Sequence, residues 1–198
     1  MTVSHQIMRR LRARGRGAVF SATDFLDLAN RAAVDQTLTR LARRGTVRRL
    51  KRGLYDYPRV DPRLGALSPS PDAVAQAVAR QTNSIVQIDG AQAANSLGLS
   101  TQVPAQPVYL TNGPSRRVQI GRRVIALKHV SPKKLIAAGT RAGTVVQALR
   151  YLGPNAAIPL QDVAARILHP RDRQALAREA AKAPVWMQSL LARIAHAA

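Results

Sequence analysis

The sequence has 198 residues, 46% of them hydrophobic, and carries 31 lysines and arginines against 10 acidic residues, a formal net charge of +21. This length and apolar content allow one good core or two small ones and argue against global disorder. The charge favours a polyanionic partner, and nucleic acid ranks above a membrane surface because no apolar run approaches the ~18 residues of a transmembrane helix. The absence of cysteine excludes disulfides, thiolate zinc sites and cysteine nucleophiles. We expect a cytoplasmic, nucleoid-associated protein.

Basic charge is concentrated in the first third of the chain. Residues 1–60 carry a net charge of +10, and the rest of the chain, more than twice as long, carries +11. A proline- and serine-bearing stretch then interrupts both helical and strand patterns. We therefore predict an N-terminal domain over residues 1–60, a linker over 61–71 and a C-terminal domain over 72–198.

The N-terminal domain opens with two predicted helices. Apolar spacing indicates the first over residues 4–14. The second is short and begins at Ser21, where Asp24 completes a capping box and Phe20 is placed to pack against Phe25 as a hydrophobic staple.

A third helix is predicted from the Asn30 cap to Arg44, with Gly45 just beyond its end. One face is apolar, whereas the opposite face is small, polar and basic. Such a face suits the major groove, because Gln and Arg can bind base edges bidentately. The other interpretation is an ordinary solvated face. The DNA-binding candidates on this helix are Arg31, Gln36, Thr39, Arg40 and Arg43.

The next segment is typical of a basic β-hairpin. Two short strands flank Lys51-Arg52-Gly53, and glycine at the third loop position fits a three-residue hairpin loop. A basic hairpin directly after a recognition helix is a wing, whose tip would lie at phosphates or the minor groove. Its candidates are Arg48, Arg49, Lys51 and Arg52. The order of three helices and a wing predicts a winged helix-turn-helix that binds duplex DNA.

The C-terminal domain mixes strands and helices. The predicted helices lie at residues 72–80, 89–97 and from 142 to 195, and the predicted strands at 84–88, 108–111, 117–120 and 124–127. The fold class is therefore α+β: a winged helix-turn-helix followed by a domain with a small, mainly antiparallel sheet and C-terminal helices.

The strand region also displays a secondary basic patch. It would either extend the DNA footprint or receive an acidic protein, or it is simply the exposed side of a hairpin. Its members are Arg116, Arg117, Arg122, Arg123, Lys128, Lys133 and Lys134.

Sequence signals for catalysis and cofactors are missing. The four histidines are scattered, and neither a phosphate-binding loop nor a serine nucleophile elbow is present. Ten acidic residues make a two-metal nuclease difficult to assemble, although Asp61, Asp72 and Asp89 could converge in space. We expect no enzyme activity, no cofactor and no metal, and keep a nuclease as an alternative.

Beyond this general pattern, the sequence resembles the AbiEi-type antitoxin family, including its short branch. The matching segments are RAAVDQTLTRL (31–41), GTVRRL (45–50), RGLYDYP (52–58), GAQAANSLGLSTQVP (90–104) and VYLTNGPSR (108–116). The resemblance covers roughly residues 4–135.

The resemblance implies a type IV antitoxin of a phage-defence toxin-antitoxin system. Its winged helix would repress its own promoter at inverted repeats through the helix at 31–44 and the wing at 48–52. Its C-terminal domain would counteract a nucleotidyltransferase-like toxin, with direct contact left open. The alternatives are a non-specific DNA- or RNA-binding protein, or a transcriptional regulator without a toxin partner.

Overall fold

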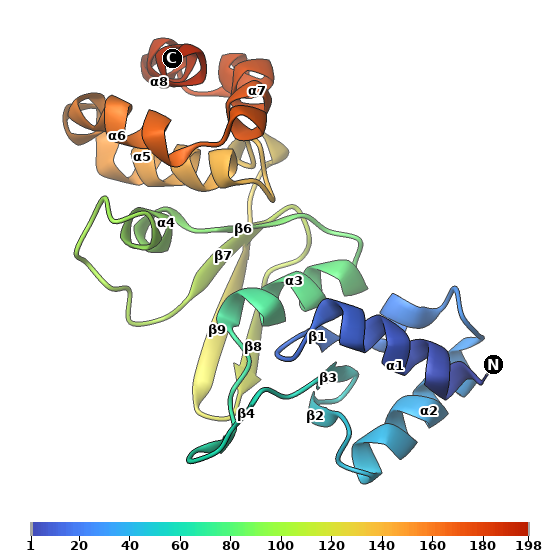
Figure 1. Cartoon of the computed structure of the whole chain (residues 1–198). Coiled ribbons are helices and arrows are strands. Elements are labelled where there is room, and N and C mark those ends of the chain that lie inside the picture. The colour runs from blue at the N-terminus through green and yellow to red at the C-terminus, as the bar shows by residue number, and fades with distance from the viewer. Residues whose placement is uncertain (1, 198) are drawn as a thin grey trace. The chain divides into compact units, whose positions relative to one another are not determined.

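The computed structural model describes residues 2–197. The chain divides into two compact units, Met1–Ser84 and Ile85–Ala198. Each unit combines helices with a small sheet, so the predicted α+β fold class is confirmed (Figure 1).

The first unit contains the winged helix. Its three-stranded antiparallel sheet has the order β1-β3-β2, so the strand before the helix-turn-helix pairs with the second strand of the hairpin. The elements, in chain order, are α1 (Val3–Arg14), β1 (Val19–Phe20), the 3-10 helix η1 (Ala22–Phe25), α2 (Arg31–Arg43), β2 (Arg48–Lys51) and β3 (Leu54–Asp56).

One apolar core joins these elements. Buried side chains from α1, η1, α2 and the sheet meet in it, and the stripe at Val34, Leu38 and Leu41 turns one face of α2 inward. The rings of Phe20 and Phe25 meet edge to face with centroids 5.6 Å apart, as the predicted staple requires. The opposite face of α2 is therefore left to solvent.

The predicted second helix is a single 3-10 turn. Its capping residue Ser21 donates its backbone N–H to Asp24 Oδ2 at 2.9 Å, so the Asp24 half of the capping box forms. The α2 cap also forms, because Asn30 Oδ1 accepts the Ala33 N–H at 2.9 Å.

The predicted linker over 61–71 is largely structured, and the predicted boundary is wrong. A two-stranded hairpin, β4 (Val60–Asp61) and β5 (Gly65–Ala66), is followed by the helix α3 (Pro71–Gln81), whose N-terminus is capped by Ser70. These elements belong to the first unit, which ends at Ser84. Local sequence could not show this, because long-range contacts to the winged helix hold α3.

The second unit contains a four-stranded sheet with the order β6-β7-β9-β8. The pairs β6/β7 and β8/β9 are antiparallel and β7/β9 is parallel, so the sheet is mainly antiparallel as predicted. The elements are β6 (Val86–Ile88), α4 (Gly90–Ser96), β7 (Val108–Thr111), β8 (Arg116–Ile120), β9 (Arg123–His129) and the 3-10 helix η2 (Pro132–Lys134).

The end of the second unit is helical. A large apolar cluster joins these helices. The first of them, α5, also packs on α4 through the alanines Ala93, Ala94 and Ala148, and is interrupted at Gly153 (φ 75°), just before Pro154. The elements are α5 (Arg141–Ala157), η3 (Ile158–Leu160), α6 (Gln161–Ile167), α7 (Pro170–Glu179), η4 (Ala180–Lys182) and α8 (Val185–His196). Within residues 2–197, no helix is long and apolar enough to cross a membrane.

Candidate nucleic-acid interface

The outward face of α2 carries the predicted helix candidates. All five are exposed, because the apolar stripe of the same helix faces the core. Among the described residues, the side chains of Gln36, Arg40 and Arg43 make no hydrogen bond or ion pair. Their polar groups are therefore available to a ligand.

The other two helix candidates are partly engaged within α2 itself. Arg31 Nε lies 2.8 Å from Asp35 Oδ2 in an exposed pair one turn apart, which contributes little stability. Thr39 donates its hydroxyl to the Asp35 backbone oxygen at 2.8 Å and keeps its acceptor lone pairs. Both side chains stay at the surface, so they remain candidates for DNA binding, but weaker ones than Gln36, Arg40 and Arg43.

The wing forms, but its turn is tighter than predicted. Lys51 pairs with Leu54, so the turn itself holds only Arg52 and Gly53, and the register shifts at Leu50. Gly53 has φ 74°, a conformation that other residues rarely adopt. The turn length depends on which residues pair across the two strands, and the residue types of the loop do not predict that pairing.

The tip of the wing is basic and exposed. Lys51 and Arg52, with Arg49 on the strand before them, make no ion pair among the described residues. Gln81 of α3 donates from Nε2 to the Gly53 backbone oxygen at 3.0 Å, which anchors the tip. Nothing in the local sequence indicated this brace, because Gln81 lies 28 residues along the chain.

Arg48 does not belong with the exposed cations. Its Nη2 lies 2.6 Å from Oδ2 of the buried Asp56, and Nε donates to Oδ1 of the same carboxylate at 3.1 Å. Its Nη atoms also donate to the backbone oxygens of Ala66 and Leu67. These bonds use four of the five guanidinium donors, so Arg48 holds the sheet together and has a weaker claim as the predicted phosphate ligand than the exposed wing cations.

The secondary basic patch is not one surface. Because residues paired across strands share a face, Arg117 and Lys128 lie on one side of the β8/β9 ribbon and Arg116 and Arg123 on the other. Arg122 lies in the connecting turn. Lys133 and Lys134 belong to η2, after the sheet. All seven are exposed, but strand register divides the predicted patch.

Comparison with known proteins places the chain in a family. The family described as DUF6088, a family of unknown function, matches residues 6–174. The chain belongs to the DUF6088 family. Among solved structures, it is similar to the RV2827C protein from Mycobacterium tuberculosis at 18% identity and a TM-score of 0.40, over 98% of this chain and 82% of that one. No curated protein matches it. This distant likeness is too weak to carry a functional argument.

Carboxylates do not gather into a metal site in the part of this DUF6088 chain that the structure describes. No group of three histidine or acidic side chains in residues 2–197 could hold a metal ion. Asp61 instead shapes a turn, because its carboxylate accepts hydrogen bonds from the backbone N–H groups of Leu64 and Arg63, and these bonds lower its pKa.

The second unit of the DUF6088 chain has a half-open cavity of about 230 Å³ beside α4 and α5. Asp89, Lys134 and Arg150 line it, and burial lowers the pKa of Arg150. Arg150 Nη1 donates to the backbone oxygen of Lys134 at 3.2 Å. The sequence did not indicate this cavity, because its lining residues come from four separate segments.

Proposed function

We propose that the first unit binds duplex DNA sequence-specifically, with α2 in the major groove and the wing on the flanking backbone. The observation that carries the proposal is that one unit has both a helix face, at Gln36, Arg40 and Arg43, whose side chains make no hydrogen bond or ion pair among the described residues, and a hairpin with a basic tip. A polar side chain that already forms its hydrogen bonds within the protein gains little binding free energy from a hydrogen bond to a base. These three side chains have no partner among the described residues.

The chemistry of the face suits base recognition. Glutamine binds the N6 and N7 edge of adenine bidentately, and arginine binds O6 and N7 of guanine, each worth about 1–3 kcal/mol of discrimination. Lys51 and Arg52, at the wing tip, are suited to phosphates or the minor groove. The helix α2 would then recognise the base sequence, and the wing would position the protein on the DNA.

Two further parts of the proposal rest on the resemblance to AbiEi-type antitoxins. The first is repression of the protein's own promoter, at inverted repeats. The second is neutralisation of a nucleotidyltransferase-like toxin encoded beside it. Co-expression tests the second part: the neighbouring nucleotidyltransferase gene should arrest growth alone and be tolerated with this protein. Arrest in both cases would remove the antitoxin role and leave a DNA-binding regulator.

The DNA-binding proposal is tested by comparing two duplexes of equal length. One carries the sequence upstream of the protein's own gene, and the other is the same sequence scrambled. Specific sites are typically bound about 10³- to 10⁷-fold more tightly than non-specific DNA. Equal affinity for both duplexes at each salt concentration would rule out sequence-specific repression. Preference for RNA over either duplex would select an RNA-binding protein instead.

A further inference from the structure

The segment predicted as a linker contains a short hairpin. Val60 pairs with Ala66 and Asp61 with Gly65, and Leu67 N–H donates to the Arg59 backbone oxygen at 2.8 Å. The Asp61 carboxylate accepts from the Arg63 and Leu64 N–H groups at 2.8 and 2.9 Å and so closes the turn. In Figure 1 the hairpin at β4 projects as a narrow arm.

Arg48 fastens the base of this arm to the wing. From its place on β2 it reaches Asp56 of β3, and it also donates to the Ala66 and Leu67 backbone oxygens at 3.2 and 2.6 Å. Asp56 is fully buried, so the joint is fixed to the interior of the first unit. The hairpin is therefore held to the wing and is not a loose linker.

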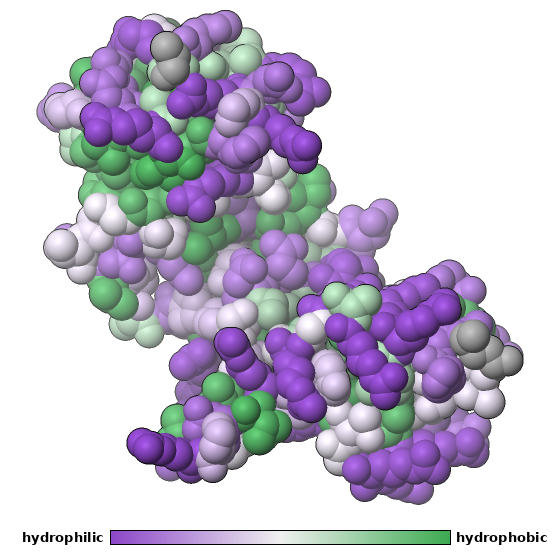
Figure 2. All heavy atoms as spheres, in the orientation of Figure 1, coloured by the Kyte–Doolittle hydropathy of each residue, from purple (hydrophilic) through white to green (hydrophobic). Residues whose placement is uncertain are grey.

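The side chains on the arm combine positive charge with exposed apolar surface. Arg59 and Arg63 are exposed and their guanidinium groups have no partner among the described residues. Leu64 is 78% exposed and Val60 58% exposed, and no core covers them. Figure 2 shows hydrophobic atoms next to strongly hydrophilic ones on this arm.

We infer that residues 59–67 form a second DNA-contacting hairpin beside the wing, with Arg59 and Arg63 on phosphates and Leu64 against the minor groove. Apolar side chains among cations are a recurrent means of minor-groove contact. Charge complementarity selects DNA as the occupant, because the surrounding domain is itself strongly basic. This inference rests on the proposed DNA-binding function.

The arm is long enough for this contact. Its tip lies three residues beyond its base at Leu67, which at about 3.3 Å per residue gives roughly 10 Å of projection. The minor groove of B-DNA is about 6 Å wide. A hairpin based at the wing can therefore reach across a minor groove that adjoins the backbone contacted by the wing.

The salt dependence of DNA affinity tests the inference. We compare the full-length wild type with Arg59→Gln/Arg63→Gln on the upstream duplex between about 50 and 200 mM salt, where each phosphate contact contributes about 0.9 to the slope of log affinity against log salt. The double variant should flatten the slope by about 1.8. It should also lose protection of a flanking minor-groove stretch from hydroxyl radicals, while protection at the recognition helix remains.

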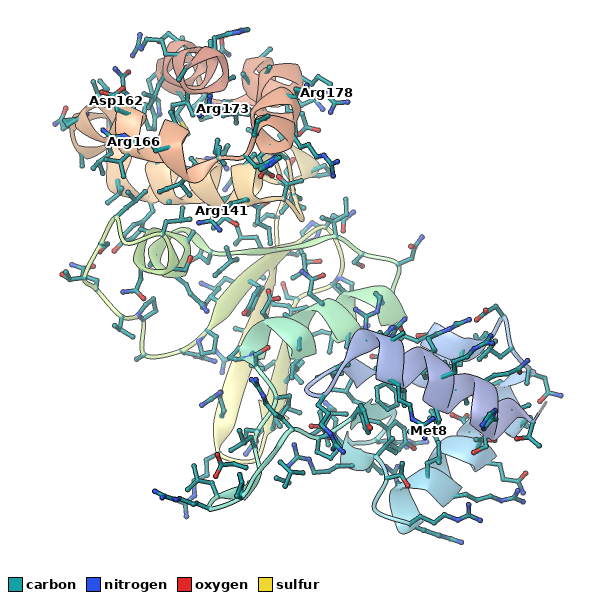
Figure 3. All side chains as sticks on the ribbon, in the orientation of Figure 1. Met8, Arg141, Asp162, Arg166, Arg173 and Arg178 are labelled. Atoms are coloured by element: carbon teal, nitrogen blue, oxygen red, sulfur yellow. The ribbon has the colours of Figure 1, made fainter. Side chains whose placement is uncertain are left out.

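The matched control removes the same charge elsewhere. Arg141→Gln/Arg166→Gln changes two exposed arginines on α5 and α6 (Figure 3) and should leave slope and footprint unchanged. Leu64→Ser should weaken binding several-fold at an unchanged slope. Unfolding temperatures equal to that of the wild type would verify that the variants fold.

The outcomes separate this inference from the proposed function. If the upstream duplex is not preferred over its scrambled form, the proposed function fails. The salt slope of DNA affinity, measured on either duplex, still shows whether the hairpin contacts DNA. A slope and footprint matching those of the control variant would overturn the inference even if specific binding holds. Loss of binding to anionic phospholipid vesicles, with an unaltered DNA slope, would overturn it in favour of a membrane contact.

Discussion

Nε of Arg80 lies 2.7 Å from Oδ1 of Asp24, joining α3 to the 3-10 helix η1 across 56 residues of sequence. Arg14 of α1 lies 3.2 Å from the same oxygen, and Arg80 also donates to the Val19 backbone oxygen. The Asp24 side chain is only 3% exposed. This carboxylate therefore ties three helical elements together, and it is one of the contacts that join α3 to the rest of the first unit.

Asp24→Ala should destabilise the first unit. The change leaves two arginines without their partner and removes the acceptor of the Ser21 N–H, at a cost of about 1–3 kcal/mol. Urea unfolding followed by circular dichroism measures it. Asp35→Ala removes the carboxylate of an exposed pair and should cost less than about 0.5 kcal/mol. Equal losses for the two variants would contradict the role given to Asp24.

Arg48→Ala should reduce stability, whereas Arg49→Ala should not. Breaking a buried ion pair costs about 3–5 kcal/mol, and we expect about 2–3 here because Arg48 is 32% exposed. The same urea titration compares the two. Arg49→Ala should instead weaken DNA binding in a salt-dependent way. Unchanged stability of Arg48→Ala, with lost DNA affinity, would restore Arg48 as a direct DNA ligand.

Acid should weaken the link between Arg10 and Asp27. Arg10 donates to both carboxylate oxygens of Asp27 at 2.8 and 2.7 Å, and this hydrogen bonding lowers the pKa of Asp27 below 3.8. A depressed folded-state pKa stabilises the fold above the unfolded-state pKa, about 4, and the contribution fades as pH falls through the folded-state value. The difference in unfolding free energy between wild type and Asp27→Asn should therefore vanish in strong acid. A difference that persists there would refute this origin.

Gly90→Ala should destabilise the second unit. An added Cβ would lie 2.6 Å from Tyr151 Cβ and 2.8 Å from the Gln147 backbone oxygen, so α4 and α5 would have to separate. Overpacking of this kind costs about 1–3 kcal/mol. Ser96→Ala, at an exposed position of the same helix, is the control. Thermal unfolding in which both variants match the wild type would show that the two helices can move apart freely.

DNA affinities of single variants test the recognition face. Gln36→Ala and Arg43→Ala should each weaken binding to the upstream duplex by about 1–3 kcal/mol and leave scrambled DNA nearly unaffected. Lys51→Ala should weaken binding to both duplexes alike, because it removes a phosphate contact. Arg9→Ala, exposed on α1, is the control. Equal losses on both duplexes for Gln36→Ala and Arg43→Ala would place the recognition face elsewhere.

The features that the sequence predicted correctly depend on neighbours a few residues apart. The Asn30 cap, the Phe20–Phe25 staple and the glycine at position 53 act within one turn, where residue type and spacing leave few alternatives. The exposed face of α2 follows in the same way, because the period of its apolar stripe determines which side faces the core.

Tertiary structure alone decided the features that join distant segments. Arg48 looks like any other wing cation in the sequence, and only folding brings it to buried Asp56 and the carbonyl groups of the next hairpin. The basic residues after position 115 form a run in the sequence, but strand register places them on opposite faces. By itself the sequence determined which segments carry charge. Long-range packing determined which charges remain free, because a guanidinium group bound to a buried carboxylate and to two backbone oxygens, as in Arg48, has only one of its five donors left for a ligand.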